Sequence, residues 1–161
     1  MRVSKINYYL DIAQTVAKRS TCLRKKYGAI IVKDDIIIAT GYNGAPRGRA
    51  NCIDLGYCIR DKLGIARGQH YELCRSVHAE ANAIIAASRG QMLGSTLYLA
   101  CEDAKTGLLE PGTCSCMMCK RMIINAGIGA VIVRDTPEEY RTIDVEDWIT
   151  NDDSLTGVAG Y

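Results

Sequence analysis

Apolar residues recur at intervals of three and four positions along the first twenty residues of the chain. The positions that share this spacing are Ile6, Tyr9, Leu10, Ala13, Val16 and Ala17. On a helix such positions fall on one face, and Ser4 stands before them as a cap. The pattern therefore predicts an amphipathic opening helix that ends near Arg19.

Two runs rich in β-branched residues follow this helix, at 28–33 and 36–42. Asp34 and Asp35 separate the two runs, which is typical of the turn in an antiparallel hairpin. A similar apolar run at 95–101 predicts a further strand.

Two later segments are predicted to be helices because each ends at a glycine. Residues 78–89 are rich in alanine and are followed by Gly90, and residues 116–126 are followed by Gly127. A buried strand is expected next, at 128–133. The predicted order of elements is α, β, β, α, β, α, β, which favours an α/β fold built in layers.

A long segment, about 43–76, separates the hairpin from the first of these helices. It is rich in glycine and shows little periodicity, so it is predicted to leave the sheet as an irregular excursion. Long connections in compact domains are usually functional or anchored. This one carries Cys52, Cys58, His70 and Cys74, which indicates that a metal holds it together.

Composition narrows the class of protein. The chain has 161 residues, 48% of them hydrophobic and 24% charged, which is typical of one globular domain over residues 1–161. A formal charge of +2 gives no field to gather nucleic acid, so no nucleic-acid partner is expected. Neither a membrane span nor a leader is visible, and a cytoplasmic location is predicted. The acidic tail, about 150–161, is expected to fray.

Eight cysteines in a chain without a secretion signal favour metal binding over disulfides. His78 begins one predicted helix, and Cys116 and Cys119 lie in the first turn of another. These three side chains can hold one zinc ion with an open position, which is the arrangement of catalytic zinc sites. Glu80, two residues after His78, is placed to move protons, as hydrolytic deamination requires.

The residues around this constellation resemble the deoxycytidylate deaminase family, within the zinc-dependent cytidine deaminase-like superfamily. The pairing of H-x-E with C-x-x-C is itself the general signature of zinc deaminases. The resemblance extends through residues 28–32, 40–46, 78–84 and 119–128, and it covers most of 22–133.

The resemblance implies a three-layer α/β/α cytidine deaminase-like fold with a central mixed sheet. It also implies zinc-dependent conversion of dCMP to dUMP and ammonia, which supplies dTMP synthesis, in a homo-oligomer whose subunits help to build each other's sites. Asn43 and Ala79 would then contact the nucleotide; in the competing and less favoured interpretation, Asn43 and Gly44 form only a turn.

Some members of the family that this chain resembles carry a second, structural zinc. The residues left for it are Cys22, Cys52, His70 and Cys74, with Cys58 as the alternative fourth ligand. Four protein ligands would close such a site. The competing interpretation is that the cysteines are small buried apolar residues and that the histidine lies at the surface.

The chain also departs from the family pattern. Ser115 stands where the family has a proline, the loop at 102–113 is longer than usual, and Cys114 offers a competing thiolate. Candidate cations for a substrate phosphate are Arg24, Lys25, Lys26, Arg47, Arg49 and Arg89. Two alternative functions stay open: a nucleic-acid base deaminase of the same fold, and a noncatalytic zinc scaffold or nucleotide-sensing module.

Overall fold

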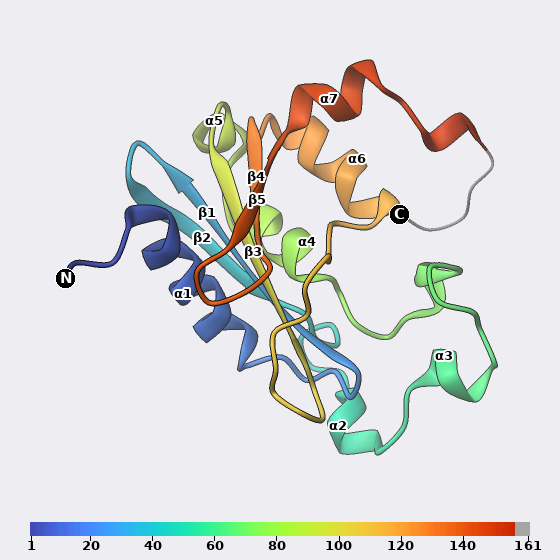
Figure 1. The fold of residues 1–161 in the computed structure, drawn as a ribbon. Coiled ribbons are helices and arrows are strands. Elements are labelled where there is room, and N and C mark those ends of the chain that lie inside the picture. Colours follow the sequence, from blue (N-terminus) through green and yellow to red (C-terminus); the bar gives the residue numbers. More distant parts are fainter. Residues whose placement is uncertain (157–161) are drawn as a thin grey trace.

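A five-stranded mixed sheet forms the centre of the computed structural model, which describes residues 1–156 (Figure 1). Its strands are β1 (Lys25–Lys33), β2 (Ile36–Tyr42), β3 (Thr96–Asp103), β4 (Ala130–Arg134) and β5 (Tyr140–Asp144). They lie in the order β2-β1-β3-β4-β5, and only the β3/β4 pair is parallel. The predicted hairpin is therefore confirmed as β1 and β2.

Helices cover both faces of this sheet. The main helices are α1 (Lys5–Ala17), α4 (Ala79–Ile85), α6 (Met117–Ala126) and α7 (Val145–Thr150), and the short ones are α2 (Cys52–Leu55), α3 (Ile59–Lys62) and α5 (Arg89–Met92), with 3-10 turns at Tyr71–Leu73 and Ser154–Thr156. The helix α1 packs on one face, and α4 and α6 pack on the other (Figure 1). The predicted three-layer α/β/α architecture is confirmed.

The opening helix begins where the sequence predicts. The Ser4 side chain accepts a hydrogen bond from the Asn7 backbone N–H, which caps the helix. Leu10, Ala13 and Ala17 are fully buried against β1 and β3, as the apolar spacing requires. This face forms one of two separate cores, and the other lies between the sheet and the helices α4, α6 and α7.

The predicted helix at 78–89 is wrong in its length. The helix α4 ends at Ile85, and Arg89 begins a separate helix, α5, that contains Gly90. The break occurs because Ser88 caps a new helix. Its side chain accepts from the Gln91 backbone N–H, and its own backbone N–H donates to the Gln91 side chain. Local capping therefore overrides the helix propensity of the alanines.

The chain beyond Arg134 contains two elements that the predicted order lacks. The strand β5 pairs with β4 and the helix α7 follows at once, capped by the side chain of Asp144. Residues 154–156 add a 3-10 turn, and the fraying expected over about 150–161 stays a prediction. The part of that prediction that concerns 157–161 lies outside the described residues.

The excursion at 43–76 contains more regular structure than its weak periodicity indicates. It folds into two short helices and a 3-10 turn. Its two ends meet. The Gly44 N–H donates to the Val77 carbonyl at 3.2 Å, and the Val77 N–H donates back to the Gly44 carbonyl at 2.7 Å. The chain therefore re-enters the fold one residue before His78.

Candidate active site

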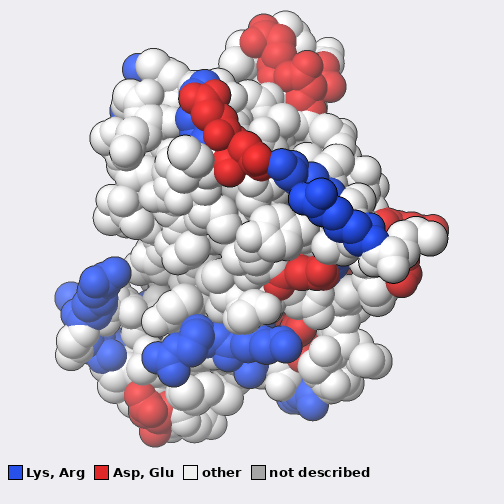
Figure 2. Space-filling model, turned by 90° about the vertical axis from the view of Figure 1, so that its left-hand side faces the viewer, with Lys and Arg blue, Asp and Glu red and all other residues white. Residues whose placement is uncertain are grey.

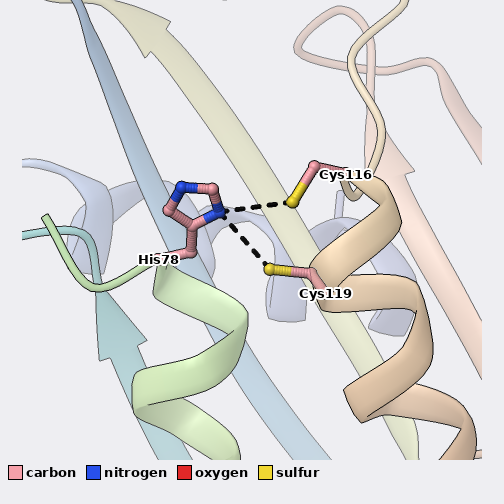
Figure 3. Close-up of side chains that lie close together, drawn as sticks. All are labelled: His78, Cys116 and Cys119. Carbon is pink, nitrogen blue, oxygen red and sulfur yellow. Dashed lines mark hydrogen bonds between the residues drawn. The ribbon is translucent and has the colours of Figure 1, made fainter. Parts of the chain in front are cut away.

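The starts of α4 and α6 converge on the sheet face opposite α1. His78 is the residue before α4, and Cys116 is the residue before α6, with Cys119 one turn further on. Both sulfur atoms lie 3.4 Å from Nδ1 of His78, which points between them (Figure 3). Within residues 1–156, this is the one group of three or more ligand atoms that all lie within 4.8 Å of one another.

The three side chains fit zinc in donor type and spacing. Zinc takes imidazole nitrogen at about 2.1 Å and thiolate sulfur at about 2.3 Å in tetrahedral sites, which puts nitrogen and sulfur about 3.6 Å apart. The observed separations of 3.4 Å are close to that value. Three protein ligands leave a fourth position, so this donor set suits a catalytic metal.

Electrostatics favour the ionised form of one thiol. A hydrogen bond from Cys119 lowers the pKa of Cys116 to about 4, against the effect of burial and with help from His78. The pKa of Cys119 is raised by the neighbouring Cys116 and by burial. Burial also opposes a charged His78, but contacts with Cys116, Cys74 and Glu80 outweigh it and raise the pKa of His78 to about 10.

Glu80 lies in the first turn of α4 with 4% of its surface exposed. Burial raises the pKa of its carboxyl, although the nearby His78 opposes that shift. A buried carboxyl with a raised pKa can hold and release a proton nearer neutral pH than an ordinary glutamate. This is the property that general acid–base chemistry needs.

An aromatic ring from the excursion packs on the same imidazole. The Tyr71 ring meets the His78 ring edge-on at 5.2 Å between centroids, and the Arg60 guanidinium lies over the Tyr71 ring, 4.4 Å from its centroid. Arg60 is 5% exposed and donates to the carbonyls of Ala66 and Gln69. The excursion is therefore folded against the site by a buried cation and an aromatic ring, contacts that sequence spacing did not reveal.

The loop before Cys116 is held in place by several bonds. Asp103 accepts from the backbone N–H groups of Lys105 and Thr106, which closes its tight turn. Asp135 accepts from the Gly112 N–H at 2.7 Å and pairs with Arg141, which also donates to the Thr113 carbonyl. The loop is thus anchored to Arg141 of β5 and to Asp135, which follows β4.

The strand β3 takes part of this predicted loop. It runs to Asp103, because Lys25 and Lys26 of β1 extend the ladder opposite it. Cys114 stays half-buried outside the metal group, so the described ligand set is not closed by a fourth thiol.

Asn43 is buried, and its side chain bonds to the backbone of β1. Its Oδ1 accepts from the Tyr27 N–H at 2.8 Å, and its Nδ2 donates to the Lys25 carbonyl at 2.9 Å. Ala79 is fully buried at the start of α4, where its backbone N–H precedes the first helical bond. Asn43 therefore lies directly after β2 and Ala79 at the start of α4, and their contact with substrate stays a prediction.

The predicted structural zinc ligands are only partly brought together. Cys52 is buried, and its pKa is raised by burial and then by the thiols of Cys22, Cys74 and Cys58 nearby. His70 is exposed, and its Nδ1 pairs with Glu72 at 2.8 Å. Within the described part of the chain, these side chains form no group as tight as the one at His78.

Comparison with known proteins supports the geometry. Residues 3–135 match the family model of the cytidine and deoxycytidylate deaminase zinc-binding region. The chain belongs to this family. It is 38% identical over 130 residues to a deoxycytidylate deaminase of Mycobacterium phage D29, covering 78% of this chain and 90% of the phage protein.

A yeast relative and a solved structure extend the comparison. The chain is 35% identical over 131 residues to a deoxycytidylate deaminase of Schizosaccharomyces pombe, covering 81% of this chain but only 37% of the yeast protein. It therefore spans little more than a third of that relative. A cyanophage S-TIM5 dCMP deaminase solved with dCMP and dUMP matches with a TM-score of 0.55 and 26% identity over 83% of each chain.

Proposed function

We propose that this protein is a zinc-dependent deaminase of cytosine nucleotides that converts dCMP and water to dUMP and ammonia. The convergence of His78, Cys116 and Cys119 beside the buried Glu80 carries the proposal. The cyanophage structure with dCMP and dUMP, and the relatives named deoxycytidylate deaminase, support this choice of substrate.

His78, Cys116 and Cys119 would hold the zinc, and Glu80 would move the protons. Zinc bound there supplies Lewis acidity, which activates water for attack on the ring carbon that carries the amino group. Glu80 accepts a proton from the water and donates it to the ring nitrogen. It would then move the second proton of the added water to the amino group, so that the carbon–nitrogen bond breaks, the added oxygen becomes a carbonyl and ammonia leaves. The raised pKa of the Glu80 carboxyl suits both directions of transfer.

The backbone around the site provides contacts for the nucleotide. The Ala79 N–H at the start of α4 is one of the donors that no helical carbonyl takes, so it suits a carbonyl oxygen of the base. Asn43 uses one Nδ2 hydrogen on Lys25 and has a second for a sugar hydroxyl. The bonds of Asn43 to β1 hold its amide in one orientation.

Strand geometry favours Lys25 over its neighbour Lys26 as the ligand of the substrate phosphate. Gly28 faces α1, so alternation along β1 places Lys26 on that same face and Lys25 on the face of the metal group. Lys25 is held by Asp103 at 3.1 Å and by Glu110. We expect Lys25→Ala to raise KM for dCMP about tenfold, with Lys26→Ala as the matched control that leaves it unchanged.

A second, structural zinc is also proposed, on Cys22, Cys52, Cys58 and Cys74. The charge coupling of Cys52 to the other three thiols supports this set, and the exposed pair of His70 with Glu72 favours Cys58 as the fourth ligand. Metal analysis should then give two zinc ions per chain for the wild type and for His70→Asn. One zinc ion per chain is expected for Cys52→Ser.

Charge distribution gives the nucleic-acid alternative no support. On the face drawn in Figure 2, basic side chains form separate strips with acidic side chains and wide uncharged areas between them. Proteins that bind single strands instead use a continuous basic groove with stacking aromatic residues.

No helix in residues 1–156 combines the length and hydrophobicity of a membrane span. A cytoplasmic location stays a prediction.

Assembly into a homo-oligomer remains part of the proposal. Ile85, at the end of α4, is 76% exposed, and such an exposed apolar side chain suits a contact with a second copy. Light scattering of the purified protein at several concentrations should give a mass above 17.6 kDa. A stable monomer at every concentration would contradict this part.

The deciding experiment measures ammonia release from dCMP, dCTP, cytidine and deoxycytidine by zinc-loaded protein. We expect turnover of dCMP, a loss of about 10³-fold or more in Glu80→Gln, and no loss in the exposed control Glu72→Gln. Zinc content should be equal in all three proteins. Zinc-replete wild type that is inactive on every compound would favour the scaffold alternative.

A further inference from the structure

Tyr71 belongs to the excursion, yet its ring packs on a residue of the metal group. The Tyr71 ring and the His78 imidazole lie 5.2 Å apart between centroids, with 77° between their planes. This is the edge-to-face arrangement in which two aromatic rings attract each other. Both sulfur atoms of the metal group lie 3.4 Å from Nδ1 of the same imidazole. The imidazole is therefore contacted by the two thiols and by a ring that the chemistry above does not use.

The backbone alone does not set the plane of the His78 ring. Residue 78 has extended backbone, with φ −68° and ψ 154°, and Val77 before it is tied to Gly44 by two hydrogen bonds. These contacts fix where the side chain starts. The last torsion of a histidine side chain is broad and nearly two-fold, and a half-turn about it replaces Nδ1 by a ring carbon. A metal ligand at this position therefore needs a contact that holds the ring plane.

Tyr71 is suited to that task because a buried cation holds it in turn. The Arg60 guanidinium lies 4.4 Å from the centroid of the Tyr71 ring, and Arg60 is almost fully buried. Its Nη2 donates to the Ala66 carbonyl at 3.0 Å and to the Gln69 carbonyl at 2.7 Å. Within residues 1–156 Arg60 forms no ion pair, so these carbonyls and the ring stabilise its charge. The ring is thus fixed by a group that the backbone of the excursion holds in place.

A second tyrosine and cation in the excursion form the same kind of pair without reaching the metal group. Nζ of Lys62 lies 4.6 Å from the centroid of the Tyr57 ring, and Tyr57 is exposed. In the part of the chain that the structure describes, the Tyr57 ring packs on no other ring. The two pairs share their chemistry and their segment, and they differ in contact with His78.

We propose that Tyr71 is a positioning residue that holds the His78 ring with Nδ1 toward Cys116 and Cys119, and that Arg60 acts by holding Tyr71. The inference rests on the metal site of the proposed function. Contacts that orient a metal ligand without touching the metal contribute about 10- to 100-fold to metal affinity. The excursion then does more than connect β2 to α4, because its fold sets how tightly the catalytic metal is bound.

The experiment measures zinc binding at His78 itself. The chain contains two histidines, so protein made with isotope-labelled histidine gives nuclear magnetic resonance signals from the rings of His70 and His78 alone. These signals are followed while free zinc is raised in a metal buffer. The second zinc proposed above uses only cysteines, so the His78 signals report the catalytic metal. The exposed His70 is the internal reference.

We expect Tyr71→Ala to need about tenfold more free zinc than the wild type for half-occupancy. Tyr71→Phe, which keeps the ring, and the matched control Tyr57→Ala should stay within about twofold of the wild type. At saturating zinc, kcat and KM for dCMP should be near wild type in all of them, because the bound metal then holds the imidazole. If Tyr71→Ala does not fold, Tyr71→Leu keeps most of the volume without the flat ring and should show the same loss of affinity.

Arg60→Met tests the second half of the inference. Removing the cation loosens the ring without deleting it, so zinc affinity at His78 should fall about threefold. In the Tyr71→Ala background the same change should have no further effect, because no ring is left to hold. An equal loss in both backgrounds would show that Arg60 does not act through Tyr71.

Three outcomes would overturn the role of Tyr71. Equal zinc affinity in Tyr71→Ala and Tyr57→Ala would show that the ring does not position His78. Equal losses in Tyr71→Phe and Tyr71→Ala would assign the effect to the hydroxyl, and a raised KM with unchanged zinc affinity would make Tyr71 a substrate contact. A wild type whose His78 signals ignore zinc contradicts the proposed metal site, whereas a zinc-responsive wild type equalled by Tyr71→Ala contradicts only this inference.

Discussion

Gly41 of β2 offers the sharpest test of how the fold places the metal group. A Cβ atom at Gly41 would lie 2.4 Å from the Ala79 carbonyl oxygen and 2.4 Å from the Ala83 nitrogen, both backbone atoms of α4. Ordinary contacts of this kind need about 3.4 Å, so α4 must move by about 1 Å to admit an alanine. His78, the residue before α4, would move with it.

The size of the effect follows from this displacement. Forcing one extra methyl group into a packed contact costs about 1 to 3 kcal/mol, and the high end applies because rigid backbone must move. For a chain of this length, that lowers the melting temperature by roughly 5 to 10 °C. A shift of about 1 Å at catalytic groups costs about 100-fold in rate. Gly41→Ala should therefore lose both stability and activity.

Two other glycines make the assay specific. A Cβ at Gly90 meets nothing within 4 Å, so Gly90→Ala should melt and turn over dCMP as the wild type does. A Cβ at Gly28 meets the Ala13 carbonyl oxygen at 2.0 Å on the opposite face of the sheet, so Gly28→Ala should lose stability through α1 instead. If Gly41→Ala behaves like Gly90→Ala in melting temperature, zinc content and kcat, backbone contact does not set the position of α4.

Three further outcomes are expected. Asp135→Asn should lower stability by about 1 to 2 kcal/mol at pH 7 in urea titrations. A hydrogen bond from Arg141 lowers the pKa of folded Asp135, so the carboxylate contributes stability above the unfolded pKa of 3.8. The stability difference between wild type and variant should disappear as the pH falls below 3.8 and through the lowered folded pKa. Arg134→Met should lower the free energy of unfolding by about 2 kcal/mol, because the buried guanidinium of Arg134 donates to Asn7, Asp11 and Gln14 of α1. An unchanged urea midpoint would show that these bonds do not hold α1 on the sheet. Removing zinc with a chelator should lower the melting temperature, and adding zinc should restore it.

Some of the fold was predictable because local patterns determine it. The apolar spacing that predicts α1 is the spacing that packs it on β1 and β3, and the turn at Asp34 and Asp35 joins the two strands as expected. His78 and Cys116 are far apart in the chain, yet both stand at helix starts. That shared position was enough to predict their meeting, because β2 and β3 both run antiparallel to β1, so the helices α4 and α6 that follow them start at the same edge of the sheet.

Other features depend on contacts that no local pattern carries. The strand β5 alternates between exposed and half-buried residues at the sheet edge, so it lacks the apolar run that identifies a buried strand. His70 was expected at a metal, but its nearest charged neighbour is Glu72, two residues away, and the pair faces solvent. The packing of Tyr71 on His78 depends on how the excursion folds back, which its glycine-rich sequence does not specify.

The paired hydrogen bonds between Gly44 and Val77 separate the length of the excursion from the geometry of the site. Because the two ends of the segment are held together, its interior can lengthen or shorten without moving either end. Doubling the length of a flexible closed loop costs only about 0.6 kcal/mol in chain entropy. Insertions and deletions within 45–76 that keep the contact of Tyr71 with His78 should therefore be tolerated by the sheet and by the site, which makes this segment the natural place for relatives of this chain to differ in size.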